Sequence, residues 1–349
     1  MTRMFFDGHT DTLKSLYLSG RDFLVRGNEG HLDLPRARDG GVVGGLFSIQ
    51  VPAEREEERK FGYGLTLTSK AWRVELAAEV SRQFAEHFVE EVMKSFQNTL
   101  DRSKEVCLVT DYAGLKACVE GGSFAVVLHY EGAEAIASDL SNLEGHYARG
   151  LRALAPVWSR PNAFGCGAAF IYPSGRADGP GLSHAGRRLV EQCNDLGIMI
   201  DLAHMTDAAF WDTASSTQLP LVVTHAGAQE VCPSATNLTN DQIDAVGATG
   251  GVIGVLFDVV NTRPDGRDVL ATPLEHVLEH FEYIAERIGL AHVAFGSDFD
   301  GGMMPCCLDS AAKIPRLLDA LRRRGYNETE IDKVSYENWF RVLRQSWKE

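Results

Sequence analysis

The sequence predicts an α/β fold, and within that class a (β/α)8 barrel of the TIM type, on three observations. Eight short apolar segments alternate with longer amphipathic ones along the chain. Most of the short segments are near-continuous apolar runs, which is typical of parallel strands covered on both faces. The turn after the first segment lacks the glycine-rich pattern that usually marks a doubly wound open sheet. The predicted strands are Met4–Gly8, Val42–Val51, Phe124–His129, Leu151–Val157, Ile198–Ala203, Leu221–Thr224, Val252–Phe257 and His292–Gly296.

Helical patterns occupy the intervals between these strands. The longest predicted helix covers Thr66–Leu100, where six apolar residues recur at helical spacing. A second covers Ser183–Asp195 and stops at Gly197, a residue that commonly ends helices. The charged segment from Pro52 to Gly64 is predicted to be a loop over one face of the barrel.

Capping patterns locate the later helices. Thr239 and Gln242 have the spacing of a capping box, and Thr272 is followed by proline and, three residues later, by glutamate. The helix that Thr272 opens is expected to extend to about Ile288. The tail adds a helix over Ile314–Arg324 and one or two more after Asn327, which completes the alternation that a barrel requires.

Composition restricts the class of protein. No linker or composition shift divides the 349 residues, so we expect a single barrel domain over residues 1–349. The net charge of −14 disfavours binding to nucleic acid, which requires basic patches. No signal-peptide core or membrane-length apolar run occurs, so no membrane association is expected. Seven cysteines without a Cys-x-x-Cys pair indicate reduced thiols and a cytoplasmic location.

Polar, metal-capable residues follow five of the eight predicted strands. The carboxyl ends of barrel strands meet at one face, where the active sites of such barrels lie. In the first ending, His9 and Asp11 are two positions apart, so their side chains point the same way on a strand. Imidazole and carboxylate groups together suit a divalent metal such as zinc. The candidate residues in these endings are His9 and Asp11, Glu131, His204, His225, and Asp298.

Two alternatives to Glu131 exist near the third strand. His129 and Glu134 are also metal-capable, but Gly132 allows the backbone to approach closely after Glu131, so Glu131 is preferred. By strand parity Asp201 points away from His204. Asp201 is therefore expected to support the site or the fold rather than to bind the metal directly.

One further motif has the inverted zinc-protease pattern H-x-x-E-H. It runs from His276 to His280 on the helix that Thr272 opens. The apolar stripe of that helix comprises other residues, so His276, Glu279, His280 and Tyr283 are predicted to lie on its solvated face. We therefore interpret this motif as surface and not as a metal site.

The ordered set of strand endings resembles a known family. The likeness to the membrane (renal-type) dipeptidases, the M19 metallopeptidases of the amidohydrolase superfamily, spans nearly the whole chain. It includes the Asn194-x-x-Gly197 segment before the fifth strand and the tail from Asp309 through Asn338. Each motif is short, but their order along the chain is specific. The segments that carry the likeness are His9-x-Asp11, Glu131-Gly132, Asp201-Leu202-Ala203-His204, Thr224-His225 and Gly296-Ser297-Asp298-Phe299-Asp300-Gly301.

The resemblance implies a dinuclear zinc hydrolase in a distorted barrel. His9, Asp11 and Glu131 would hold one Zn²⁺, and Glu131, His204 and His225 would hold the other, so that Glu131 bridges the two ions. A hydroxide shared by the two ions would attack the amide bond of a dipeptide or a dipeptide-like small molecule. Asp298 would be the catalytic carboxylate that moves the proton. A homodimer would fit the same resemblance.

Three positions depart from the family pattern. Trp158 aligns with a substrate-contacting histidine, so Trp158 is expected to line the substrate site. Thr236 aligns with the arginine that often grips the substrate carboxylate, and Arg160, Arg176 or Arg263 could replace it from neighbouring loops. Asp258 follows the seventh strand, where the family tends to carry an aromatic residue, and faces either a substrate amine or water.

These departures keep two rival functions open. The first is another amidohydrolase reaction on the same metals, with an N-acyl amino acid, a β-lactam or a lactone as substrate. The second is a metal-binding protein without catalytic activity. The full ligand set together with Asp298 argues against the second rival, because structural zinc sites are usually closed and four-coordinate.

Overall fold

A computed structural model describes residues 3–55, 65–68, 71–174 and 176–347, and a ring of eight strands lies at its centre. Neighbouring strands pair in parallel, and isolated bridges from Asp201 to Val222 and from Thr10 to Phe299 close the ring. The structure therefore confirms the predicted barrel. In ring order the strands are β1 (Phe5–Thr10), β2 (Val42–Ile49), β6 (Phe124–Glu131), β7 (Leu151–Ala155), β11 (Met199–Ile200), β12 (Val222–Ala226), β13 (Val252–Val255) and β14 (Val293–Phe295).

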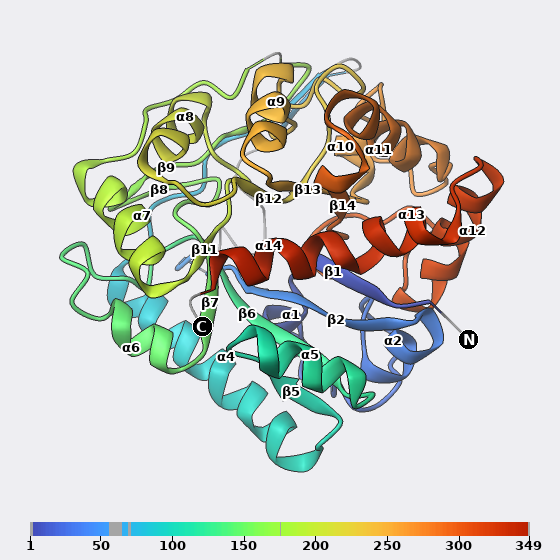
Figure 1. Cartoon of the computed structure of the whole chain (residues 1–349). Helices are drawn as coiled ribbons and strands as arrows, with labels where there is room; N and C mark the ends of the chain where they lie inside the picture. Colours follow the sequence, from blue (N-terminus) through green and yellow to red (C-terminus); the bar gives the residue numbers. More distant parts are fainter. Residues whose placement is uncertain (1–2, 56–64, 69–70, 175, 348–349) are drawn as a thin grey trace.

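Helices cover the outside of the ring (Figure 1). Among the described residues, no helix combines the length and the apolar character that crossing a bilayer requires. All seven cysteines are free thiols, as expected. The helices are α1 (Thr12–Ser19), α2 (Leu34–Gly40), α4 (Arg82–Arg102), α5 (Tyr112–Glu120), α6 (Leu143–Ala148), α7 (His184–Leu196), α8 (Asp207–Ser216), α9 (Asn240–Ala248), α10 (Val259–Thr262), α11 (Glu275–Ile288), α12 (Ile314–Arg323), α13 (Glu328–Asp332) and α14 (Asn338–Ser346).

The last helix closes one end of the barrel. Figure 1 shows α14 lying across the ring of strands. Its Trp339 is fully buried, and the indole Nε1 donates a hydrogen bond to the carbonyl of Phe295 at 3.0 Å. This end is therefore filled with apolar side chains, and the site must form at the opposite end. The interior side chains that pack with Trp339 include Phe6, Leu46, Val127, Ala153, Met199, Val222, Val252 and Ala294.

The prediction of one long helix over Thr66–Leu100 is wrong. Two short strands, β3 (Leu65–Leu67) and β4 (Trp72–Val74), precede α4, which begins only after its capping residue Ser81. β4 pairs antiparallel with β10 (Phe170–Tyr172), and Trp72 Nε1 donates to the carbonyl of Gly266 at 2.7 Å. These contacts with segments far along the chain override the local helical pattern.

The remaining strands lie outside the ring. A two-stranded sheet joins β8 (Pro161–Asn162) to β9 (Gly165–Cys166), and β5 (Val106–Leu108) pairs in parallel with the start of β6.

Two predictions about α11 are also wrong. The helix begins at Glu275, and Thr272 does not cap it, because its hydroxyl donates instead to the carbonyl of Val269. His280 is fully buried and not on the solvated face. Its Nδ1 accepts from the backbone N–H of Ala228 at 2.8 Å, and its Nε2 donates to the carbonyl of Thr262 at 3.1 Å. His280 is thus a satisfied structural histidine that joins three segments of the fold.

The remaining helix predictions are confirmed. α7 ends at Gly197, which adopts φ 78°, a left-handed conformation that favours glycine. α9 begins with the predicted capping box between Thr239 and Gln242. The tail forms α12, α13 and α14. Most of the predicted loop from Pro52 to Gly64 lies outside the described residues.

Removing the indole that closes the barrel should destabilise the fold. Trp339→Ala creates a cavity at a fully buried position, so we expect the free energy of unfolding to fall by about 3–5 kcal/mol. Urea denaturation followed by circular dichroism measures this loss. Trp211→Ala is the matched control, because Trp211 on α8 is 44% exposed and should cost no more than about 0.5 kcal/mol. Equal losses for both variants would contradict the role assigned to Trp339.

Candidate metal centre

Glu131 lies among three histidines at the carboxyl ends of the strands. It is the last residue of β6 and is almost fully buried. Its Oε1 lies 2.9 Å from Nε2 of His204 and 3.6 Å from Nε2 of His225. Its Oε2 lies 3.6 Å from Nε2 of His9. Residues from four strand ends therefore converge on one carboxylate.

Electrostatics couple these groups closely. Burial alone would raise the pKa of Glu131, but His9 and His204 hold it well below its usual range. Burial opposes protonation of His9, yet the carboxylates of Glu131, Asp298 and Asp11 raise its pKa to about 9. Burial, with His9 and His204 beside it, holds the pKa of His225 well below its usual range. The centre therefore requires positive charge, which a proton supplies in part and a metal ion would supply more fully.

The five predicted ligands form two groups that share Glu131. The first comprises His9, Asp11 and Glu131, and the second comprises Glu131, His204 and His225. Within each group the ligand atoms lie within 4.8 Å of one another. Nε2 of His9 is buried and has no hydrogen-bond partner. An orphaned imidazole nitrogen among carboxylates fits a divalent cation, and nitrogen with carboxylate oxygen is a donor set that zinc accepts.

The alternatives to Glu131 occupy different surroundings. Nε2 of His129 lies 3.4 Å from Oδ2 of Asp201, deeper in the barrel, in a group with His9 and Asp201. Glu134 lies 3.7 Å from Nε of Arg160 and belongs to none of the ligand groups found among the described residues. Of these three candidates, Glu131 alone belongs both to the group with His9 and Asp11 and to the group with His204 and His225, which favours it over His129 and Glu134.

Hydrogen bonds behind the histidines orient their rings. The Thr224 hydroxyl donates to Oδ2 of Asp201 at 2.6 Å and lies 2.9 Å from Nδ1 of His225. Because the hydroxyl proton goes to Asp201, Nδ1 of His225 must donate, which leaves its Nε2 free to bind a metal. Nδ1 of His204 similarly lies 3.2 Å from Oγ of Ser159. Asp201 thus has the supporting position that its strand parity predicted.

Sequence reasoning missed the side chains that hold Asp11. Nζ of Lys14 lies 2.5 Å from Oδ2 of Asp11 and 3.1 Å from Oε1 of Gln50. The Ser48 hydroxyl, from β2, donates to the other oxygen of Asp11. The contact of Lys14 with Asp11 could have been predicted from the sequence, because a residue three positions after Asp11 lies on the same face of a helix. The contact of Ser48 could not be predicted in this way, since its proximity depends on the pairing of β1 with β2.

The backbone is unusual at several site residues. His204 and Asp298 both have φ 61°, in the left-handed region that non-glycine residues rarely occupy. Such conformations cluster at functional sites, where surrounding contacts hold them in place. Gly132 has φ 101°, and a Cβ there would lie 2.3 Å from the Glu134 carboxylate. A glycine is therefore required directly after Glu131, in agreement with the sequence argument.

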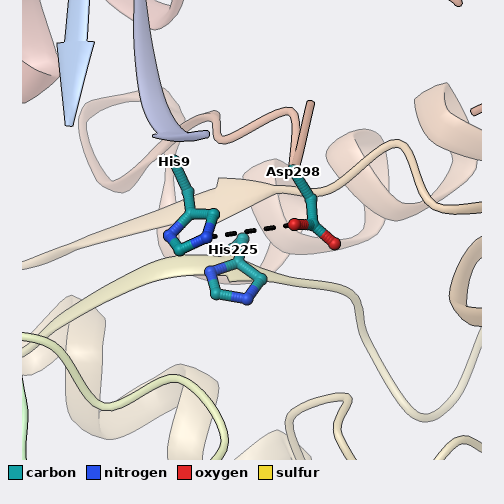
Figure 2. A group of neighbouring side chains, drawn as sticks. All are labelled: His9, His225 and Asp298. Atoms are coloured by element: carbon teal, nitrogen blue, oxygen red, sulfur yellow. Dashed lines mark ion pairs between the residues drawn. The ribbon is translucent and has the colours of Figure 1, made fainter. Parts of the chain in front are cut away.

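Asp298 faces the metal-ligand groups from the end of the eighth strand. One carboxylate oxygen lies 3.9 Å from Nε2 of His9, and Figure 2 shows both side chains beside His225. Burial raises the pKa of Asp298 well above its usual range, and the carboxylates of Asp11, Glu131 and Asp258 add to the effect. A carboxyl group that binds a proton more readily than usual suits proton transfer near a reacting bond.

A large cavity opens above these residues. Its volume is about 1240 Å³, and it reaches the ligands Asp11, Glu131, His204 and His225 as well as Asp298. All three positions that depart from the family pattern line its walls, namely Trp158, Thr236 and Asp258. Trp158 lies beside the centre, since its ring centroid is 6.2 Å from that of His204.

The three arginines considered as carboxylate anchors lie elsewhere. Arg160 is fully buried and donates to the carbonyl of Val51 at 2.6 Å. The side chain of Arg176 is 74% exposed, and Arg263 pairs with Asp265 at 2.6 Å. None of the three lines the cavity, whose cationic lining residues in the described part of the chain are Lys14 and Arg267.

The fold and the site together define a class of protein, the TIM-barrel metal-dependent hydrolases. Within this class the chain belongs to the membrane dipeptidase family, peptidase family M19, whose model matches residues 1–348. It is a metallodipeptidase of that family.

Similar proteins support this assignment. A crystal structure of a metallo peptidase from Rhodobacter sphaeroides, liganded with a phosphinate mimic of the dipeptide L-Ala-D-Ala, has a TM-score of 0.95 and 35% identity, covering 99% of this chain and 100% of that one. The dipeptidase AC, also of family M19, has a TM-score of 0.92 and 36% identity, covering 99% of each chain. An uncharacterized protein in the pqqA 5′ region of Klebsiella pneumoniae is 41% identical over 237 residues, which are 68% of this chain and 88% of the relative.

Replacing the shared carboxylate should remove bound metal. Glu131→Gln neutralises the group that both ligand sets contain, so we expect the metal content after gentle purification to fall at least about twofold relative to the unaltered protein. Inductively coupled plasma mass spectrometry on folded protein measures this. Glu134→Gln is the matched control and should retain the metal. Retention by Glu131→Gln with loss from Glu134→Gln would reverse the assignment.

Proposed function

We propose that this protein is a dinuclear zinc dipeptidase. The observation that carries the proposal is that Glu131 lies within 3.6 Å of three imidazole nitrogens and belongs to two overlapping ligand groups. His9 and Asp11 would complete one zinc site, and His204 and His225 would complete the other. When bound, two zinc ions would polarise the scissile carbonyl and lower the pKa of the attacking water.

Asp298 is proposed to move the proton during hydrolysis. Its carboxylate faces the cavity beside His9, and its raised pKa favours accepting a proton from water. The proton would then pass to the leaving nitrogen, so that the amine departs as a neutral group. His9, His204 and His225 would hold position throughout, because the hydrogen bonds of Thr224 and Ser159 fix two of their rings.

A dipeptide is the substrate class that the comparisons favour. The structural neighbour from Rhodobacter sphaeroides binds a phosphinate mimic of L-Ala-D-Ala and is 35% identical over nearly the full length of both chains. The cavity here is large enough for a dipeptide with extended side chains. Trp158 would form a wall of the substrate site, because it lines the cavity next to Phe170 and His204.

A second candidate function arises from the wall near Thr236. The Thr236 hydroxyl lies 3.2 Å from the amide oxygen of Asn261, and none of the three arginines considered as carboxylate anchors lines this cavity. Without a bidentate partner for a free carboxylate, another small amide or ester becomes the alternative substrate. N-acyl amino acids, β-lactams and lactones are the classes to compare.

We further infer that residues 1–349 form a single catalytic domain, because β1 and β14 from opposite ends of the chain close one ring. The seven free thiols favour a reducing compartment, and we propose the cytoplasm.

A substrate panel tests the proposed function. The zinc-loaded enzyme should hydrolyse L–L or L–D dipeptides at least about tenfold faster, by kcat/KM, than N-acyl amino acids, β-lactams or lactones. Amine release measured by mass spectrometry follows all classes in one assay. Turnover of another class without any dipeptide turnover would replace the main proposal by the second candidate.

Removing the proposed proton carrier should abolish most of the rate. Asp298→Asn cannot accept the proton, so kcat should fall by about 10²- to 10⁴-fold while the zinc content stays at about two. Steady-state kinetics with the best dipeptide measures the loss. Asp309→Asn is the control, because Asp309 also lines the cavity but pairs with Lys313 at 2.5 Å. An unchanged rate in Asp298→Asn would exclude the role proposed for Asp298.

A further inference from the structure

Asp258 is a buried carboxylate in the cavity wall. It follows β13, is 5% exposed, and lines the same cavity as the metal-ligand groups. One oxygen accepts a hydrogen bond from the backbone N–H of Met303 at 2.8 Å, and the other accepts from the side-chain amide of Asn261 at 2.7 Å. Both donors are neutral, so the charge of this carboxylate has no opposite charge beside it.

Two other aspartates of the same cavity are compensated. Asp265 pairs with Arg263 at 2.6 Å, and Asp309 pairs with Lys313 at 2.5 Å. For Asp258, by contrast, no ion pair is found with any residue in the described part of the chain. Burial accordingly raises the pKa of Asp258 to about 6, so the group is still mostly ionised at neutral pH. Buried carboxylates are normally paired with a cation, and among the described residues this one has no such partner.

The two cationic residues of the cavity wall are engaged elsewhere. Lys14 contacts Asp11 and Gln50, on the metal side of the cavity. Arg267 is exposed at the mouth, and its charge acts on Asp265. Neither residue forms an ion pair with Asp258 in the described part of the chain, so this carboxylate can accept a cation from a bound molecule.

The position of Asp258 indicates which part of a substrate would reach it. Asp258 and Asp298 lie close together beside Gly302, where a Cβ would be 2.7 Å from Oδ2 of Asp298 and 2.9 Å from Cβ of Asp258. Asp258 belongs to none of the metal-ligand groups found among the described residues. A cation bound at Asp258 would therefore lie near the reacting bond. An α-ammonium group has no long apolar stem, so the apolar lining of the cavity favours a basic side chain in this position.

The apolar lining of the cavity suits the stem of a long basic side chain. Trp72, Trp158, Phe170 and Tyr172 line the cavity. Trp72 and Tyr172 stack with their ring centroids 5.9 Å apart. Long basic side chains bury their methylene groups against apolar surface while the charged end contacts a polar group. The cavity thus combines apolar lining residues with a buried carboxylate that has no ion-pair partner among the described residues.

We propose that Asp258 is a specificity-determining residue that binds the cationic side chain of a basic dipeptide. The inference rests on the proposed dipeptidase function and names the substrate class within it. Thr236 and Asn261 belong to the same hydrogen-bonded wall, in which Asn261 fixes the Asp258 carboxylate toward the cavity. This wall offers an acceptor to a lysine or arginine side chain and repels an acidic one.

Matched dipeptides test the proposal. Zinc-loaded enzyme is assayed with dipeptides that carry lysine, norleucine or glutamate at either position, because norleucine preserves the stem of lysine and removes its charge. We expect kcat/KM for the best lysine dipeptide to exceed that of its norleucine analogue by about tenfold or more. Glutamate dipeptides should be the poorest. Equal rates for lysine and norleucine at both positions would refute the proposal.

The variant Asp258→Asn tests whether Asp258 causes the preference for lysine dipeptides. It should raise KM for the lysine dipeptide about tenfold while the norleucine dipeptide keeps its kinetics within about threefold. Asp265→Asn is the matched control, since this aspartate lines the cavity but is already paired, and it should preserve the lysine preference. A parallel loss on both substrates in Asp258→Asn would indicate a purely structural role and overturn the proposal.

Binding measurements distinguish a failure of this proposal from a failure of the proposed dipeptidase function. If no dipeptide is hydrolysed, the dipeptidase function fails, and calorimetry then decides the role of Asp258. Tighter binding of the lysine dipeptide than of the norleucine analogue, lost in Asp258→Asn, supports the cation site alone. Equal binding of the two overturns it.

Discussion

The attraction between the Glu131 carboxylate and three imidazoles is the interaction around which the mouth of the barrel is arranged. A buried carboxylate is unfavourable unless cations or strong donors surround it. Here the end of β6 faces three histidines, which are His9 near the end of β1, His204 in the segment after β11 and His225 near the end of β12. Gly132 lets the chain turn away directly after Glu131, and the left-handed backbone of His204 aims its ring inward. The charge balance of this cluster also explains why a divalent metal fits there.

The barrel can support such a polar cluster because apolar side chains fill its other end. Trp339 on α14 fills the base of the ring, and apolar side chains from the strands pack around it. Polar groups are thereby confined to one end, where supporting hydrogen bonds from Thr224 and Ser159 satisfy the histidine rings. Stability and function are separated along the barrel axis, as in other barrels of this type.

The cavity above the centre divides into two regions of different character. Near the strand ends lie Asp298 and the ligand groups, which we propose carry out the hydrolysis. Trp158, Thr236 and Asp258 line the wall beside this centre, and Asp258 is a buried carboxylate without an ion-pair partner among the described residues. In the proposed function, substrate choice and bond cleavage depend on different residues, so the first can change while the second is preserved.

The sequence alone determined the strands, their order and the set of metal-capable residues, because strand runs and strand endings are local patterns that the barrel brings to one face. Tertiary structure decided the features that depend on distant partners. Pairing of β4 with β10 broke the predicted helix over Thr66–Leu100, and contacts with Ala228 and Thr262 buried His280. Likewise, only the folded chain distinguishes the paired Asp265 from the unpaired charge of Asp258. Local patterns specify elements and their ends, whereas burial and charge compensation arise from residues that are far apart in the sequence.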